Sequence, residues 1–224
     1  MGQTEAFAHN AAKLGIDLSS VDFAVLSHGH YDHGGGLAEF LRLNRTAPVY
    51  VSEYAFGDYY NGSEKYIGLD KNLQNSSRLV FVKNHLRISD SAEILTLSPD
   101  ALPHPIEPFG LGVMRDGTIY KEDFRHEQFL RIRENGRDYL FSGCAHTGVV
   151  NLVEIYSPDV FIGGFHFSKL DPWSSSLKNA SEVLRSSKTA FFTGHCTGKE
   201  QYCALKDTLG DRLTYTGTGF TGII

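Results

Sequence analysis

The chain contains little cysteine and no long apolar run. Its 224 residues include three cysteines, Cys144, Cys196 and Cys203, without a Cys-x-x-Cys pair. This sparse, odd set argues against a disulfide framework and favours a reducing compartment, so we expect a cytoplasmic protein. No stretch of about 18 apolar residues is present, and no basic segment followed by an apolar one opens the chain. We therefore expect neither a membrane partner nor a secretory signal.

Two further absences narrow the function classes. The net charge is −5 and no long basic run occurs, which argues against a general nucleic-acid surface. The chain also lacks a Gly-x-Ser-x-Gly motif, which disfavours a serine hydrolase. With 41% hydrophobic and 21% charged residues, the composition is that of a soluble globular protein, and we expect a single domain over residues 1–224.

Histidine, in contrast, is frequent and clustered. Of the ten histidines, three stand in the segment His28-Gly-His30-Tyr-Asp32-His33, which follows the apolar run 21–26 and precedes three glycines. Because His28 and His30 are two positions apart, extended backbone directs both side chains to one side, where they can chelate one metal. A turn can direct the side chains of Asp32 and His33 towards a second metal ion. Imidazole and carboxylate ligands suit zinc, iron or manganese, and a polar turn without metal is the alternative.

Three more histidines each follow an apolar run. His146 comes after 139–141, His166 after 161–162 and His195 after 190–193. Ligands at parallel strand ends gather at one edge of a sheet, so these side chains can meet the first motif in one cleft. A structural histidine that bonds a loop carbonyl is the alternative for each. The four other histidines are interpreted as surface or structural residues: His9, His85, His104 and His126.

The elements expected along the chain are early strands with a hairpin, followed by alternating helices and strands. A continuous apolar run at 21–27 predicts a buried parallel strand, and Asn135-Gly136 predicts a hairpin turn. Residues 53–75 are interpreted as helix and loop, and 98–112, with four prolines, as an extended loop. Helices are expected at 6–14, 37–43, 149–156, 176–185 and 199–209, and strands at 48–52, 79–82, 92–97, 129–133, 138–141, 160–163, 190–193 and 213–216.

The His-x-His-x-Asp-His motif at 28–33 resembles the signature of the metallo-β-lactamase fold. Gly-Cys-Ala-His-x-Gly at 143–148 with Asn151, Gly-Gly-Phe-His at 163–166, His-Cys-Thr-Gly at 195–198 and Lys-Tyr-Ile-Gly-Leu at 65–69 look like one branch. That branch contains dihydropterin-aminobenzene-phosphate synthase-like proteins and relatives called metal-dependent hydrolases. The resemblance implies an α/β (α+β) fold, an αββα sandwich of two mixed sheets flanked by helices.

The resemblance also implies a ligand set for two divalent ions, zinc in the first place, with iron or manganese as alternatives. His28, His30 and His146 would hold the first ion, and Asp32, His33 and His195 the second. The family's bridging carboxylate is missing; Cys144 stands near that place and could bridge or simply pack. His166 would contact substrate or metal, or brace its loop, and Cys196 and Cys203 are interpreted as small buried residues. Asp32 and His166 are the predicted catalytic residues.

Three functions follow from this resemblance. The first is a hydrolase that uses a metal-bound hydroxide on a small-molecule ester, lactone or phosphoester. The second is a pterin-type synthase that joins a dihydropterin to an aminobenzene-ribose phosphate, with Lys65 and nearby rings as its pocket. The third, a catalytically impaired metal-binding module, is motivated only by the departure of the first residues from the family pattern. The candidate rings for a pterin pocket are Tyr54, Phe56, Tyr59, Tyr60 and Tyr66.

The beginning of the chain departs from the family pattern. Family members open with two strands and an Asp-Thr-Gly turn, and Met1-Gly2-Gln3-Thr4 resembles only the tail of that turn. The first strands of the fold are therefore expected to be absent. A homodimer is one way to cover the sheet edge that this would expose.

Overall fold

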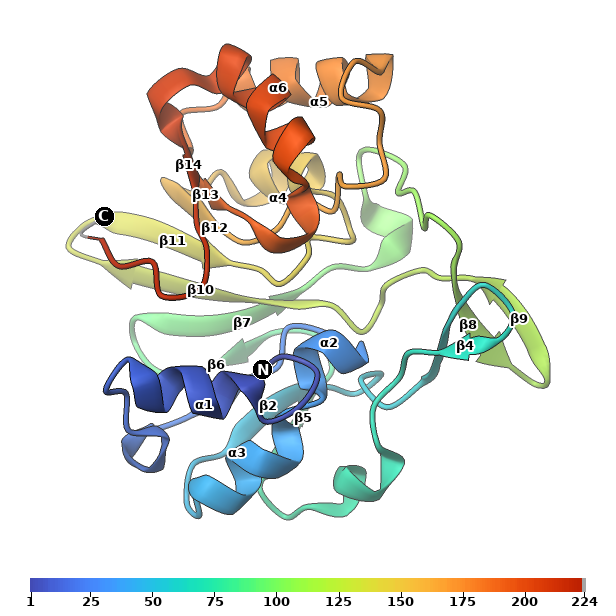
Figure 1. The fold of residues 1–224 in the computed structure, drawn as a ribbon, viewed down its shortest axis with the longest axis vertical. Helices are drawn as coiled ribbons and strands as arrows, with labels where there is room; N and C mark the ends of the chain where they lie inside the picture. Colours follow the sequence, from blue (N-terminus) through green and yellow to red (C-terminus); the bar gives the residue numbers. More distant parts are fainter. Residues whose placement is uncertain (223–224) are drawn as a thin grey trace. The chain divides into compact units, whose positions relative to one another are not determined.

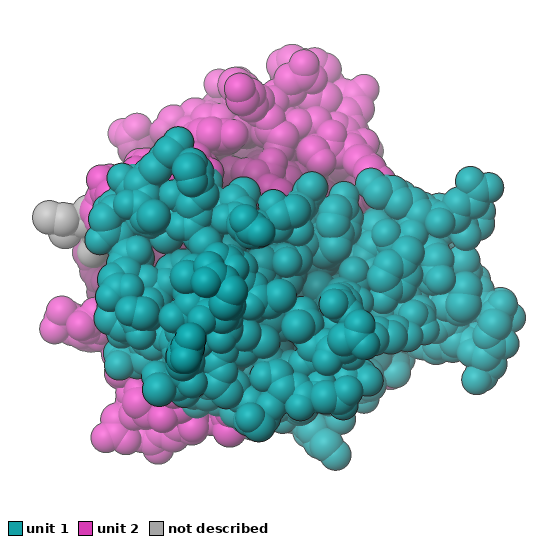
Figure 2. All heavy atoms as spheres, turned by 60° about the horizontal axis from the view of Figure 1, so that its bottom comes forward, with its two compact units in different colours: residues 1–85, 110–128 teal, residues 86–109, 129–224 magenta. Residues whose placement is uncertain are grey.

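The structure is a computed structural model that describes residues 1–222 and contains two compact units (Figure 2). Unit 1 consists of residues 1–85 and 110–128, and unit 2 of residues 86–109 and those from 129 onward. Each unit is described by itself, and the single domain expected over residues 1–224 stays a prediction. No helix among the described residues is long and apolar enough to cross a membrane.

The first sheet of unit 1 is parallel and carries the histidine-rich motif. Its strands are β1 (Ala24–Val25), β2 (Val49–Ser52) and β5 (Leu79–Val82), in the order β1-β2-β5. The helices α1 (Ala6–Lys13) and α3 (Leu37–Leu43) belong to the same unit (Figure 1). Leu26, Leu37, Phe40, Val49 and Val51 form its buried core. The parallel strand predicted at 21–27 is thus confirmed, with a regular part of only two residues.

The second sheet of unit 1 is antiparallel and was not expected. Its order is β4-β3-β8-β9, with β3 (Asp58–Asn61), β4 (Lys65–Tyr66), β8 (Leu111–Arg115) and β9 (Thr118–Lys121). The interpretation of 53–75 as helix and loop is therefore wrong for β3 and β4, and the loop predicted at 98–112 ends where β8 begins. Asp116 and Gly117, with φ of 49° and 77°, form the β8–β9 turn. Positive φ at both positions is the geometry that Asp-Gly favours in a two-residue hairpin.

Unit 2 is built on a mixed sheet of order β14-β13-β12-β11-β10-β7-β6. The predicted hairpin joins β10 to β11, and its turn residues Asn135 and Gly136 have φ of 51° and 76°. From β11 to β14 all neighbours are parallel. The strands are β6 (Leu86–Arg87), β7 (Ala92–Thr96), β10 (Gln128–Glu134), β11 (Arg137–Phe141), β12 (Val160–Ile162), β13 (Ala190–Thr193) and β14 (Leu213–Tyr215).

The parallel half of this sheet alternates with three helices, as predicted. They are α4 (Val149–Tyr156), α5 (Ser175–Ser186) and α6 (Lys199–Leu209) (Figure 1). Their apolar faces pack on the strands through Leu152, Leu177 and Leu205, which are buried with Phe161 and Phe191 in one core. Such βα units direct the carboxyl ends of β11, β12 and β13 to the same edge, where the loops with predicted site residues begin.

Candidate metal centre

The histidine-rich motif of unit 1 turns from strand to helix at His30. His30 has extended backbone, with φ −86° and ψ 144°, and the short helix α2 (Tyr31–Gly34) begins directly after it. The rings of His28 and His30 lie side by side, with centroids 4.9 Å apart. This is the placement that the two-residue spacing predicts for extended backbone.

Helix α2 brings the other two predicted ligands to the same place. The ring of His33 lies 4.1 Å from that of His28, measured between centroids. The Nε2 atom of His33 lies 3.7 Å from Oδ2 of Asp32. Within unit 1 the structure thus brings together His28, His30, Asp32 and His33.

Two glycines of this turn tolerate no side chain. A Cβ atom at Gly29 would lie 2.2 Å from the carbonyl oxygen of Ala55, and one at Gly35 would lie 2.1 Å from that of Gln3. Both obstacles are backbone atoms, so a side-chain rotation cannot relieve the clash. Glycine is therefore needed at both positions for close packing of the backbone.

Behind His30 lies a buried carboxylate that the local sequence does not indicate as a site residue. The Oε1 atom of Glu122 lies 3.1 Å from Nε2 of His30 and 2.5 Å from Nε2 of His126. All three side chains are buried. His126 was interpreted as a surface or structural histidine, and the structure confirms the structural alternative.

The hydrogen bonds of His126 determine its tautomer. The backbone N–H of Gly29 donates to Nδ1 of His126 at 2.7 Å, so Nδ1 carries the lone pair and Nε2 carries the proton. Nε2–H then donates to the carboxylate of Glu122. Two ligands of one tetrahedral zinc ion lie about 3.3 Å apart for bonds of about 2.0–2.1 Å. The 2.5 Å contact is shorter, so His126 and Glu122 form a hydrogen-bonded support rather than a metal site.

The electrostatics of this support favour a charged carboxylate and a neutral imidazole. Burial by itself would raise the pKa of Glu122, but the hydrogen bonds from His126 and His30 outweigh it and hold the pKa below its ordinary value. Burial lowers the pKa of His126 despite the adjacent carboxylate. Glu122 is therefore an anion that accepts two imidazole N–H bonds.

In unit 2 the three other predicted histidines follow three adjacent parallel strands. His146 follows β11, His166 follows β12 and His195 follows β13. Strained backbone accompanies each: Ala145, His166 and His195 have φ of 49°, 55° and 48°. Non-glycine residues in this region cost about 1–3 kcal/mol and gather at functional sites. Because the three strands are parallel neighbours, the three histidines lie at the same edge of this sheet. Their meeting with the first motif in one cleft stays a prediction.

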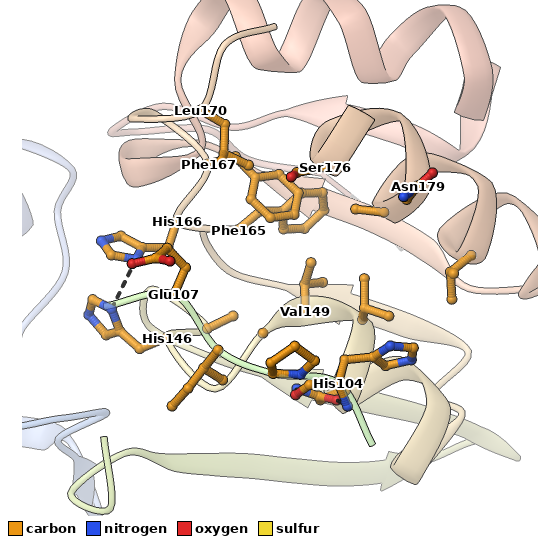
Figure 3. A pocket seen from close by; sticks show the side chains of 18 of the residues that line it. His104, Glu107, His146, Val149, Phe165, His166, Phe167, Leu170, Ser176 and Asn179 are labelled. Carbon is orange, nitrogen blue, oxygen red and sulfur yellow. Dashed lines mark hydrogen bonds between the residues drawn. The ribbon is translucent and has the colours of Figure 1, made fainter. Parts of the chain in front are cut away.

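His146 and His166 contact each other directly. Their Nδ1 atoms lie 3.2 Å apart, and one of the two rings donates this hydrogen bond (Figure 3). The ring of Phe109 packs edge-on against His166, with centroids 5.4 Å apart. His166 is therefore fixed by an imidazole on one side and a phenyl ring on another.

The cysteines have three different environments. Possible ligand atoms of Cys144, His195 and Cys196 all lie within 4.8 Å of one another, so a thiolate could join a metal there. Cys144 is buried and Cys196 half-buried. Cys203 is exposed, and its interpretation as a small buried residue is wrong because α6 presents this position to solvent.

Known proteins are similar to this chain in sequence and in fold. The profile of the metallo-beta-lactamase superfamily matches residues 2–195. An uncharacterized protein of Methanocaldococcus jannaschii is 26% identical over 207 residues, which cover 88% of this chain and 77% of that protein. The 7,8-dihydropterin-6-methyl-4-(beta-D-ribofuranosyl)-aminobenzene-5'-phosphate synthase of the same organism is 25% identical over 214 residues, 87% of this chain and 72% of the enzyme.

A solved structure agrees with these relatives. The crystal structure of Tm1679, described as a metal-dependent hydrolase of the beta-lactamase superfamily, superposes with a TM-score of 0.80 at 27% identity. The alignment covers 98% of this chain and 85% of that one. The chain belongs to the metallo-beta-lactamase superfamily, and its mixed α/β fold of several sheets and helices matches that fold, as the resemblance implies.

Proposed function

We propose that this protein is a metal-dependent hydrolase of small-molecule esters, lactones or phosphoesters. The observation that carries the proposal is the convergence of His28, His30, Asp32 and His33 in unit 1, with His30 supported by the Glu122 carboxylate. A ligating histidine that donates its second N–H to a carboxylate is the usual arrangement of a protein zinc site.

The nitrogen atoms of these histidines fit such a site. Nε2 of His30 faces Glu122, so His30 would bind a metal through Nδ1. Nδ1 of His28 lies 3.1 Å from the hydroxyl of Ser27, so His28 would bind through Nε2. With Asp32 and His33 the set combines imidazole and carboxylate, which suits zinc and also accepts iron or manganese.

The remaining ligands are proposed from the family resemblance. His146 would complete the first ion with His28 and His30, and His195 would complete the second with Asp32 and His33. Two divalent ions, zinc first among them, are therefore the proposed cofactors.

The roles of the protein groups follow from their chemistry. A bound divalent ion lowers the pKa of water and polarises a carbonyl or phosphoryl oxygen. Asp32 would orient the attacking water through its carboxylate. His166, with one nitrogen bonded to His146, would contact the substrate and exchange a proton with it.

The test is a panel of p-nitrophenyl esters, lactones and bis-p-nitrophenyl phosphate with metal-loaded protein. We expect turnover that EDTA abolishes, and a loss of at least 100-fold in Asp32→Ala. The exposed Asp90→Ala is the matched control and should retain full activity. Metal-dependent activity that persists in Asp32→Ala would remove Asp32 from the mechanism.

A pterin-type synthase is the second candidate, supported by the similarity to the M. jannaschii synthase. The proposed rings already have structural contacts: Tyr59 is buried and stacks on His126 at 4.2 Å, and Tyr60 packs edge-on against Tyr66 at 5.5 Å. A fluorescence titration with a dihydropterin tests this candidate, and failure to bind argues against it. Robust turnover of any substrate in the ester, lactone and phosphoester panel rejects the third candidate, a metal-binding module without activity.

A further inference from the structure

Unit 2 contains a pocket of about 830 Å³ with His146 and His166 in its wall (Figure 3). Helices α4 and α5 form two of its sides, the segment 165–170 after β12 forms a third, and the segment 104–109 forms a fourth. This volume lies within the range of small-molecule sites, about 300–1,000 Å³. The pocket thus extends away from the two histidines along both helices.

The walls of the pocket are mostly apolar. Each of the four segments contributes aliphatic or aromatic side chains, so an occupant would contact hydrocarbon from all four. The residues that define the walls are Ile106, Val149, Phe167, Leu170, Ala180 and Val183.

Three polar side chains of the lining, those of His104, Glu107 and Asn151, form hydrogen bonds that hold the pocket together. The Asn151 amide accepts from the backbone N–H of His104 at 2.8 Å and donates to the His104 carbonyl at 3.0 Å. The His104 ring lies 2.9 Å from a carboxylate oxygen of Glu154, and Glu107 accepts from the backbone N–H of Phe109 at 3.1 Å. These bonds fix the segment 104–109 as a wall, so the pocket is pre-formed.

The charge of the lining discriminates against anions. Among the described residues that line the pocket there is no lysine or arginine, and Glu107 adds a carboxylate. The ammonium of Lys169 lies nearby but outside the lining, where it donates to the carbonyl oxygen of Phe109 at 2.7 Å. An anionic ligand in the pocket would therefore lose its hydration without a lysine or arginine of the lining as a partner.

We propose that this pocket binds the uncharged apolar acyl part of the substrate, alkyl or aryl, whose reacting bond lies at the His146 and His166 end. The link to a reaction rests on the proposed hydrolase function. The binding of an uncharged apolar molecule does not, because it needs only unit 2 side chains and no metal.

Binding is measured on the full chain in the presence of EDTA, with N-phenyl-1-naphthylamine as an uncharged fluorescent probe. Straight 1-alkanols, phenyl-substituted alkanols and fatty acids of equal length then compete with the probe for the pocket. Each added methylene should tighten alkanol binding roughly fourfold, equivalent to about 0.8 kcal/mol, until the pocket is filled. Fatty acids should bind at least tenfold more weakly than alkanols at pH 7.5. Equal or tighter binding of the acids, or no fluorophore binding, would overturn the proposal.

Variants on opposite walls locate the site. Ala180→Glu on α5 and Ile106→Asp on the facing segment should each raise the Kd of the fluorophore at least tenfold. The control Lys178→Glu lies on the same helix outside the lining and should change the Kd less than twofold. Unchanged binding in both pocket variants, with native circular dichroism spectra, would place the ligand elsewhere and reject the assignment.

Measurements of turnover allow the pocket proposal and the proposed hydrolase function to be tested independently of each other. With metal-loaded protein, kcat/KM of p-nitrophenyl esters should rise with acyl length in the wild type and lose that dependence in Ala180→Glu. Length-dependent binding without turnover supports the pocket and counts against the hydrolase. Turnover without any dependence on the acyl group supports the hydrolase and counts against the pocket.

Discussion

Glu122 accepts a hydrogen bond from His30 across 92 positions of sequence, with 3.1 Å between Oε1 and Nε2. The same oxygen accepts from His126, whose other nitrogen is bonded to the backbone of Gly29. This chain of bonds runs from the glycine in the middle of the motif back to one of its histidines. It fixes the ring orientation of His30 before any ion binds, which is the basis of the first prediction.

Glu122→Gln should weaken metal binding by roughly 10–100-fold, the effect typical of removing a carboxylate behind a ligating histidine. The amide can still accept from one imidazole but no longer carries the charge that raises the basicity of His30. Titration of EDTA-treated protein with zinc measures the change. Asp123→Asn is the control, because Asp123 pairs with Arg115 and Arg125 instead of a motif residue. Equal affinities in Glu122→Gln and the wild type would contradict a supporting role.

Stability should fall on acidification because of His126. Burial lowers its pKa in the folded state, so the unfolded chain, with a pKa of about 6.5, takes up the proton first. The contribution is complete above about pH 6.5 and declines as the pH falls towards the folded pKa, by at most about 1.4 kcal/mol per unit. The lowered pKa of Glu122 adds a second decline that begins only below about pH 4.3.

Urea unfolding in EDTA at pH 7.5, 6.5 and 5.5 measures this decline. His126→Gln should be less stable at pH 7.5, but its free energy of unfolding should change less between the three values than that of the wild type. An identical pH dependence in both proteins would show that His126 does not titrate as the structure requires.

Gly29→Ala should destabilise the fold by about 1–3 kcal/mol, since its methyl group would meet the backbone of Ala55 at 2.2 Å. Gly217→Ala is the matched control, because no atom lies within 4 Å of the added Cβ and its φ is not positive. Its effect should stay within about 0.5 kcal/mol. Thermal or urea unfolding compares the two, and similar losses in both would argue against the tight approach at Gly29.

His166→Gln should lower kcat at least about 100-fold, the lower end of the usual contribution of general acid–base catalysis, with little change in KM. The exposed His85→Gln is the control and should behave like the wild type. Metal content is measured alongside. Loss of a metal ion in His166→Gln would instead indicate that His166 is a metal ligand. An unchanged kcat would indicate that His166 only stabilises its loop.

The sequence predicted those parts of the fold whose signals are local. The helices α4, α5 and α6 were found from the spacing of their apolar residues, and the β10–β11 turn from Asn135-Gly136. The β8–β9 hairpin carries an equally local signal in Asp116-Gly117. The strands β3 and β4 have no such signal, because the tyrosine, glycine and asparagine residues around them fit a loop equally well.

In the candidate site, too, residues with a local sequence signal could be predicted and residues without one could not. The spacing within the His28–His33 motif predicts that its side chains lie together, as the structure shows. The positions of the three later histidines after apolar strands predict their place at one edge of the sheet. Glu122 could not be recognised, because its partners lie 92 and 4 positions away and nothing in its neighbourhood marks a buried carboxylate. His126 lacks a motif for the same reason, since the N–H that fixes it belongs to a glycine 97 positions earlier.

The central claim is that the His28–His33 motif holds divalent metal, and a metal titration tests it most directly. Calorimetric titration of EDTA-treated protein with zinc should give two ions per chain, together with a higher melting temperature. His30→Ala and Asp32→Ala should each remove at least one ion. A wild-type protein that binds no zinc, iron or manganese, and melts at the same temperature with and without EDTA, would contradict the account.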